Sequence, residues 1–249
     1  MKKMIKILEG FDKRRNDRNK EEWEKKSLAE KYEEIAQWFR PCAEQILCNG
    51  YFLVNGEYII DLGAIELYYH EEEGEIKDYI MYHINDRTNS KIKQFEGGLP
   101  YFEFGSFNFH LSGIDITFEN PKEKYRASFL IRSYRVLKTE NGLYPDDAKT
   151  KYDTHPTHIF DDMFYVGVLG TEIVWIPTDK KNCALDTEPL TRINVAVCEE
   201  PDVKSEAKIM EEDYLKDPNK YIKVKVNEKY YKQDMRPWRF QLKDIEEEK

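Results

Sequence analysis

Apolar positions recur at helical spacing near the N-terminus. In the highly charged stretch from Asp12 to Arg40 they lie three to five residues apart, which fits one face of a helix. They are Trp23, Leu28, Tyr32, Ile35 and Trp38. Because Pro41 lacks a backbone N–H, we expect a break there and a short second helix over residues 43–47. The pattern indicates helices that pack on a core through one face. A partner-binding helix is the alternative.

From Tyr51 onward the spacing becomes that of strands. Two β-rich runs, residues 51–54 and 58–69, flank Asn55-Gly56, a dipeptide favoured where a hairpin needs positive φ at both central residues. Residues 70–94 are polar and predict a long loop. Further β-rich segments lie at residues 101–109, 114–118, 127–136, 164–169, 173–176, 192–197 and 221–226. The pattern therefore predicts an α+β fold: a mixed, mostly antiparallel sheet or partial barrel with helices on one side.

The composition indicates an ordered chain. Its 249 residues are 40% hydrophobic, 35% charged and 14% aromatic. Because Tyr and Phe each bury a large apolar area, rings can build the core where aliphatic residues are sparse. With no internal repeat and no Gly/Ser linker, we expect a single domain over residues 1–249. Its parts are a helical segment (1–48), a β-rich core (49–242) and a charged, frayed tail (243–249).

The formal net charge of −9 opposes general attraction to nucleic acids. Proteins that neutralise phosphates release condensed counterions and usually carry a positive face. An acidic total is compatible with one local basic groove. DNA therefore stays open as a partner through such a groove.

Several familiar kinds of site are missing from the sequence. The cysteines, Cys42, Cys48, Cys183 and Cys198, form no CxxC pair, which argues against a disulfide framework and a thiolate zinc site. No nucleotide-binding loop, HExxH or GxSxG motif occurs. The N-terminus lacks the apolar run of a secretory signal, and no segment approaches the roughly 20 apolar residues of a membrane span. We expect a cytoplasmic protein with no cofactor and no membrane contact.

Two groups of residues are candidates for a metal site. They are His155 with His158, and His70 with Glu71, Glu72, Glu73 and His83. Pro156 places the first pair in a turn, and three consecutive glutamates are typical of a solvated turn. We therefore predict no metal site.

Glu66 is the candidate for acid–base chemistry. It lies in Gly-Ala-Ile-Glu-Leu-Tyr-Tyr, a run otherwise apolar and aromatic. Alternation places Ala64, Glu66 and Tyr68 on one face of the strand, and residues 65, 67 and 69 on the other. A carboxylate in such a run is solvated, paired with an arginine, or held for a purpose such as general base catalysis.

Short motifs follow one another in the order found in a known family. They are Ala43-Glu-Gln-Ile-Leu47, Ile65-Glu66-Leu67-Tyr68, Asp78-Tyr-Ile-Met-Tyr-His83, Gly98-Leu-Pro-Tyr-Phe-Glu-Phe104, Phe129-Leu-Ile-Arg132-Ser, and Thr191-Arg-Ile-Asn-Val with Arg236-Pro-Trp-Arg239-Phe240. Over roughly residues 42–242 the chain resembles the alkyladenine DNA glycosylase family. The resemblance implies the α+β fold of that family. It also implies a monofunctional enzyme that removes a damaged or modified base in DNA repair.

The resemblance also implies roles for particular residues. An enzyme of this kind extrudes the base from the duplex into a pocket lined by rings. Tyr68 and His83 would sandwich the base, aided by a ring such as Tyr101 or Phe104. Glu66 would orient and deprotonate the water that attacks the sugar C1′.

Other residues have two interpretations. Asp115, or Gly113 in another alignment, takes the place of an asparagine at the edge of the base. Arg132 would hold the neighbouring strand or a phosphate, and a buried structural arginine is the alternative. Arg236 and Arg239 would contact phosphates or pack the C-terminal segment.

The chain also departs from the family. The family's Arg-Asn pair has no counterpart in residues 88–97, and its wedge into the minor groove has none in residues 106–110. A catalytically inert member of the fold, acting as a binding or inhibitor protein, is therefore the main alternative. A metal-dependent hydrolase that uses His70 and His83 is the third interpretation.

Overall fold

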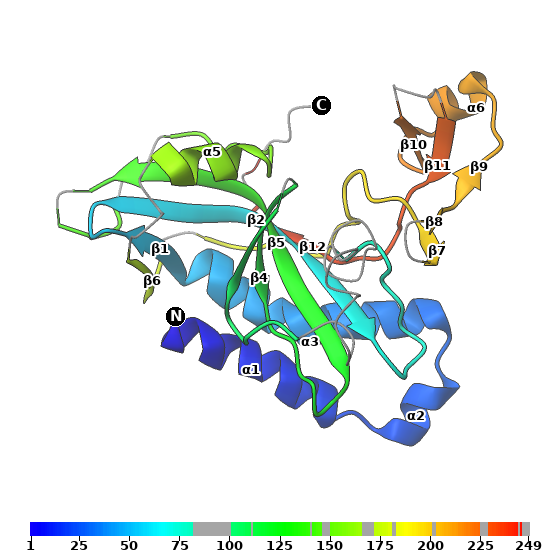
Figure 1. Ribbon diagram of the computed structural model, residues 1–249, viewed down its shortest axis with the longest axis horizontal. Helices are drawn as coiled ribbons and strands as arrows, with labels where there is room; N and C mark the ends of the chain where they lie inside the picture. The colour runs from blue at the N-terminus through cyan, green and yellow to red at the C-terminus, as the bar shows by residue number, and fades with distance from the viewer. Residues whose placement is uncertain are drawn as a thin grey trace, which may run out of the picture.

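The protein has the α+β fold that the apolar pattern predicts. The structure, a computed structural model, describes residues 1–81, 101–110, 112–139, 141–145, 150–165, 172–180, 183–200, 203–224, 229–243 and 245. A curled antiparallel sheet, close to half a barrel, lies against the long helices of the N-terminal segment (Figure 1). In these ranges no helix combines the length and apolar character needed to cross a membrane.

The N-terminal helices are α1 (Lys2–Asn16), α2 (Lys20–Lys25) and α3 (Leu28–Cys48). α1 begins ahead of the predicted start. Met4, Leu8 and Phe11 form a buried stripe at helical spacing in a segment otherwise dominated by charges. This stripe packs α1 on α3 and the sheet.

The expected helix break at Pro41 is wrong, because α3 runs through it. A capping box fixes the start of α3: Ser27 Oγ accepts the Glu30 N–H, and the Glu30 carboxylate accepts the Ser27 N–H. Pro41 is exposed, while Phe39 and Cys42 beside it are buried. Packing of the buried face therefore outweighs the roughly 3 kcal/mol that an interior proline costs a helix.

The main sheet has seven strands in the order β3-β4-β5-β2-β1-β6, with β12 paired to β2. Its members are β1 (Gly50–Val54), β2 (Tyr58–Glu71), β3 (Phe107–His110), β4 (Gly113–Thr117), β5 (Tyr125–Lys138), β6 (Ile173–Pro177) and β12 (Arg239–Gln241). β2 and β5 pair along their whole length. β1 pairs with the first residues of β2, and β12 takes the same edge further along.

Two local features shape the centre of the sheet. The predicted hairpin is confirmed, since Asn55 (φ 54°) and Gly56 (φ 72°) both have positive φ between β1 and β2. The register of β2 and β5 shifts around Gly63, which marks a β-bulge. A Cβ at Gly63 would lie 2.2 Å from Ile245 Cδ1, so a larger residue would not fit. Ile245 itself, at the start of the expected tail, is buried.

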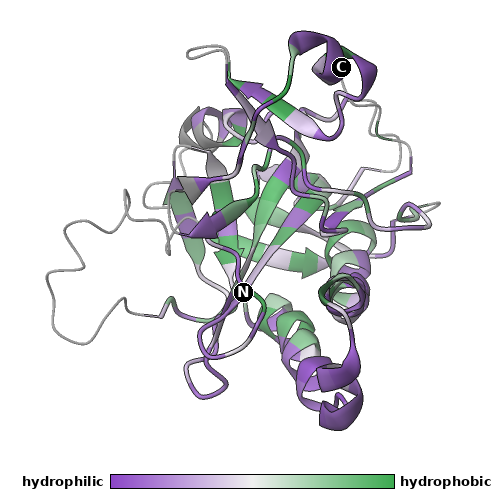
Figure 2. Cartoon of the chain, turned by 90° about the vertical axis from the view of Figure 1, so that its right-hand side faces the viewer, coloured by the Kyte–Doolittle hydropathy of each residue, from purple (hydrophilic) through white to green (hydrophobic). Residues whose placement is uncertain are grey.

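The face of the sheet toward α1 and α3 holds the hydrophobic core. Its rings include Phe39, Phe118, Phe129 and Phe240, and Ile65, Leu67 and Tyr69 of β2 point into it. Figure 2 shows the hydrophobic stretches gathered where helices and sheet meet, with hydrophilic ones on the outer sides of the helices and in the loops. The alternation predicted for residues 64–69 is therefore confirmed.

The remaining elements are small. They are α5 (His158–Tyr165), α6 (Glu211–Lys216), β7 (Cys198–Glu200), β8 (Val203–Lys204), β9 (Glu206–Ala207), β10 (Tyr221–Val224) and β11 (Lys229–Lys232). The β10-β11-β9 sheet and α6 project from one side of the main sheet (Figure 1).

Three predicted strands are wrong in part. Of the segment 101–109, only the residues from Phe107 onward form a strand, β3. Residues 164 and 165 end α5, and residues 166–169 lie outside the described residues. Residues 192–197 form an irregular segment instead of a strand. Asn194 has φ 56°, and the Ile193 N–H bonds to the Glu66 side chain and not to a neighbouring strand. A side chain therefore holds the backbone at Ile193, while residues 195–197 make isolated backbone hydrogen bonds to residues 232–234.

Candidate functional site

The second face of the main sheet buries polar side chains. Directly paired residues of neighbouring strands point to the same face, which places Glu66 in line with Arg239, Leu130 and Asp115. The buried polar members of this face are Asn108, His110, Asp115, Thr117, Arg126, Ser128, Glu66, His70, Arg239 and Gln241. Buried charges are rare unless they are paired or functional, so this face is the candidate site.

Glu66 lies at the centre of this face and is fully buried. Its Oε1 accepts the Ile193 N–H at 2.8 Å and lies 3.7 Å from Arg132 Nε. Its Oε2 accepts the Tyr68 hydroxyl at 3.3 Å. Burial lowers the pKa of the Arg239 guanidinium, and the facing Glu66 carboxylate opposes that shift. One carboxylate is thus held by a backbone N–H between two buried or nearly buried arginines.

Tyr68 contacts this carboxylate, and Asp115 lies two strands away on the same face of the sheet. Burial, together with the negative charge of Glu66, raises the pKa of Tyr68 well above its ordinary value. Its hydroxyl therefore stays protonated and donates at neutral pH. Asp115 lies on the far side of β5, since both Asp115 and Glu66 are in register with Leu130. His110 Nε2 lies 3.3 Å from Asp115 Oδ1.

A network of ion pairs lies beside Tyr68. The fully buried Arg192 donates to both oxygens of Asp78, at 2.8 and 3.2 Å, and to Asp234 at 2.7 Å. Arg236 bonds to the same two carboxylates. The Arg192 guanidinium also covers the Tyr68 ring, 4.6 Å from its centroid. Because alternating cations and anions compensate one another, this network can fix the position of Tyr68.

The sequence does not predict this ion-pair network. Arg192 and Arg236 occur in motifs that carry the family resemblance, and Asp78 occurs beside His83 in another. No sequence signal marks Asp234, which lies two residues before Arg236 but far along the chain from Asp78 and Arg192. The Arg236 guanidinium pairs with Asp78 and Asp234. Arg236 therefore has the packing role, the second of its two interpretations, and does not face a phosphate.

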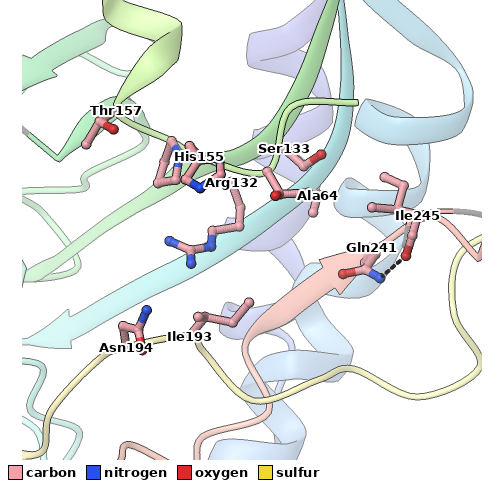
Figure 3. A pocket seen from close by; sticks show the side chains of 11 residues that line it. Ala64, Arg132, Ser133, His155, Thr157, Ile193, Asn194, Gln241 and Ile245 are labelled. Carbon is pink, nitrogen blue, oxygen red and sulfur yellow. Dashed lines mark hydrogen bonds between the residues drawn. The ribbon is translucent and has the colours of Figure 1, made fainter. Parts of the chain in front are cut away.

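A cavity of about 310 Å³ opens next to Glu66. Its lining comes from β2, β5, β12, the turn before α5 and the irregular segment: Ala64, Arg132, Ser133, Thr154, His155, Pro156, Thr157, Ile193, Asn194, Gln241 and Ile245. Figure 3 shows Arg132 reaching between His155 and Ile193. Since Arg132 and Ile193 both contact Glu66, the carboxylate lies one layer below the cavity wall.

Other predicted site residues lie elsewhere. Tyr101 is near the far end of β2, where Arg126 covers its ring at 4.1 Å from the centroid. Phe104 packs edge-on against Phe118, on the helix side of the sheet. The structure therefore does not bring Phe104 to Glu66. His83 lies outside the described residues.

The two histidine groups differ in their surroundings. His70 is buried, and its Nδ1 accepts the Asp78 N–H at 3.1 Å. Burial, with a contribution from the positive charge of Lys77, lowers the pKa of His70 to about 4. His155 and His158 instead lie close to Asp153 and offer three ligand atoms within 4.8 Å of one another. Within the described ranges this is the group whose donors could hold a metal ion.

The fold and the site together define an α+β protein with a half-barrel sheet, in which one buried carboxylate lies between two arginines. The chain matches no family model, no curated protein and no solved structure. Because a fold can host unrelated activities, the function has to be argued from the site itself.

Proposed function

We propose that this protein is a DNA glycosylase-like hydrolase that cleaves the N-glycosidic bond of a damaged or modified base, with Glu66 as the general base. The observation that carries the proposal is the setting of Glu66, a fully buried carboxylate on a central strand beside a cavity. The Ile193 N–H fixes one oxygen. The other accepts a long, weak hydrogen bond from Tyr68, which leaves it capacity to accept a proton.

The proposed reaction is a hydrolysis in which the C1′–N bond breaks and a C1′–O bond forms. Because Arg132 and Ile193 lie between Glu66 and the cavity, the reaction requires this wall to open. Glu66 then accepts a proton from the attacking water, and the bonding electron pair leaves with the base, which takes up a proton from solvent. Arg132 and Arg239 would keep the Glu66 carboxylate in position between them. General base catalysis of this kind contributes about 10²–10⁴-fold to a rate.

The cavity also fits a small flat ligand. Its volume of about 310 Å³ is at the lower end of the roughly 300–1,000 Å³ range of ligand pockets. One extruded base suits such a cavity better than a large cofactor does. The resemblance would have the base stack on Tyr68, but Tyr68 does not line this cavity and Arg192 lies over its ring, so the cavity alone does not provide that stacking surface.

A second candidate function is a binding or inhibitor protein of the same fold without catalysis. The formal net charge of −9 favours it, because an acidic protein repels the DNA backbone. The pairing of Arg192 and Arg236 with buried aspartates favours it too, since these cations are not available to phosphates.

Base release by mass spectrometry tests the proposal. Wild type, Glu66→Gln and Glu57→Gln would be incubated with alkylated, deaminated and hypermodified DNA. Glu57 is an exposed glutamate in the turn just before β2, so Glu57→Gln is a matched control. We expect release by wild type and Glu57→Gln, and a loss of at least about 100-fold in Glu66→Gln. Equal release by all three proteins would overturn the assignment of Glu66.

The salt dependence of DNA binding separates the two candidates. A glycosylase that contacts phosphates binds more weakly as salt rises, because releasing the same counterions into a more concentrated solution gains less entropy. Absence of both binding and base release with folded wild type would discard the hydrolase proposal in favour of the binding protein.

A further inference from the structure

The turn before α5 carries a group of metal-ligating side chains that the proposed reaction does not use. Asp153, His155 and His158 place three ligand atoms within 4.8 Å of one another. His158 Nδ1 lies 2.8 Å from one carboxylate oxygen of Asp153, and His155 Nδ1 lies 3.3 Å from the other. The two imidazole rings are stacked, with centroids 4.8 Å apart and planes at 24°.

The backbone explains why these side chains meet. The Asp153 backbone bonds in both directions to Tyr134 of β5, which fixes it to the sheet. Its side chain accepts the His155 N–H at 2.7 Å, and the His158 N–H bonds to the His155 carbonyl at 3.0 Å. Pro156 occupies the second position of this turn, where its fixed φ is favourable. The proline that argued against a metal pair in the sequence thus belongs to the turn that brings the histidines together.

We propose that Asp153, His155 and His158 form a binding site for a divalent transition-metal ion of the Zn²⁺ type. Imidazole and carboxylate are ligands that zinc prefers, and two histidines with one acid are a known catalytic set. Tetrahedral zinc with bonds of about 2.0–2.1 Å needs donors about 3.4 Å apart. The two carboxylate–imidazole distances, 2.8 and 3.3 Å, are already close to this value. All three ligand atoms lie within 4.8 Å of one another, so rotation of the two exposed imidazole rings is enough to bring them to the zinc geometry.

The metal-ligand group lies at the wall of the cavity, so a bound ion would be accessible from it. His155 lines the cavity together with Arg132 and its neighbours in the turn, as Figure 3 shows. An ion held by three protein ligands keeps at least one position for water or an oxyanion. Since Arg132 is the cation on the same wall, a phosphate or similar anion entering the cavity would meet positive charge from both.

This metal site does not depend on the proposed hydrolase function. Neither Glu66 nor its hydrogen-bond partners belong to the group, so the two proposals can fail separately. A pair of histidines that share the Asp153 carboxylate without any metal ion is the competing explanation.

Metal titration of the full chain without an affinity tag tests the proposal. Co²⁺ absorption and Zn²⁺ competition with a chromogenic chelator would be measured for wild type, Asp153→Asn, His155→Ala and His158→Ala. Asp161→Asn, an exposed acid on α5 outside the group, is the matched control. We expect one ion per chain in wild type and the control. Each ligand variant should bind at least about 100-fold more weakly, because even a partner of a ligand typically contributes 10–100-fold.

Nitrogen-15 spectra of the histidine rings provide a readout that does not depend on affinity. Zn²⁺ should shift the ring nitrogens of His155 and His158 and leave those of His70 unchanged. Three results would overturn the proposal: no saturable binding by wild type, equal weakening in Asp161→Asn, or a cobalt spectrum dominated by thiolate ligands.

Discussion

The two faces of the central sheet are both buried, but by opposite kinds of side chain. Toward α3, Phe39 stacks on Phe118 and meets Phe240, and no polar group intervenes in these ring contacts. On the other face, Glu66 lies between arginines, and the cost of desolvating each charge has to be offset by its partners. Apolar residues of similar size often give equal or greater stability. The comparison teaches that the first face determines whether the protein folds, and that the second is the better candidate for what it does.

The largest expected effect comes from the apolar face. Phe39→Ala removes a fully buried ring that contacts Phe11, Phe118, Phe129 and Phe240. We expect the free energy of unfolding to fall by about 3–5 kcal/mol, measured by urea denaturation. Leu215→Ala, at a residue that is 70% exposed, should change it by no more than about 0.5 kcal/mol. Similar losses in both variants would refute the core assignment.

A smaller effect is expected from the ion-pair network on the polar face. Arg192→Met keeps the bulk of the side chain but leaves Asp78 and Asp234 with Arg236 as their shared cation. Removing one member of a buried network costs about 3–5 kcal/mol, and the remaining arginine should keep the loss near about 3 kcal/mol. Lys216→Met, in an exposed pair with Asp213, is the control and should cost less than about 1 kcal/mol. Unchanged stability in Arg192→Met would mean that the network contributes specificity alone.

The third expected effect is a pH dependence set by His70, which is similar in size to the effect of Arg192→Met but develops only at acidic pH. Its pKa is lowered by burial from 6.5 to about 4, so below pH 6.5 the unfolded chain takes up a proton before the folded one does. Stability from this residue is complete above pH 6.5 and falls as the pH decreases to about 4, by about 3 kcal/mol in total. His70→Asn keeps an acceptor for the Asp78 N–H and should remove this part of the slope. An identical slope in wild type and variant, in urea denaturation across this range, would contradict the assignment.

Regular patterns made the fold predictable. Alternation in β2 sorted Glu66 and Leu67 onto opposite faces, and Asn55-Gly56 marked the hairpin, because both signals are local. α3 crosses Pro41 for a tertiary reason, the burial of Phe39 and Cys42, which a local rule does not contain.

The candidate site was predictable only in part. Glu66, Tyr68 and Arg132 lie close together, and Asp115 shares their face of the sheet, since each occurs on a strand with a clear pattern. The contact from Ile193 was missed, because the segment that supplies it looks like a strand and is not one. The grouping of Asp153 with His155 and His158 depends on a bridge to β5 that no spacing reveals.

The most direct test of the division between the two faces is a comparison of neighbouring residues, Glu66→Gln and Leu67→Ala. Base release and the free energy of unfolding would be measured for both variants, at a temperature where circular dichroism shows both to be folded. We predict that Glu66→Gln loses release at least about 100-fold, and that it also loses about 3–5 kcal/mol of stability, because Arg132 and Arg239 lose the charge that faces them. Leu67→Ala should lose about 2–5 kcal/mol and keep its release. If Glu66→Gln loses this stability but keeps its release, the polar face is structural and the account is contradicted.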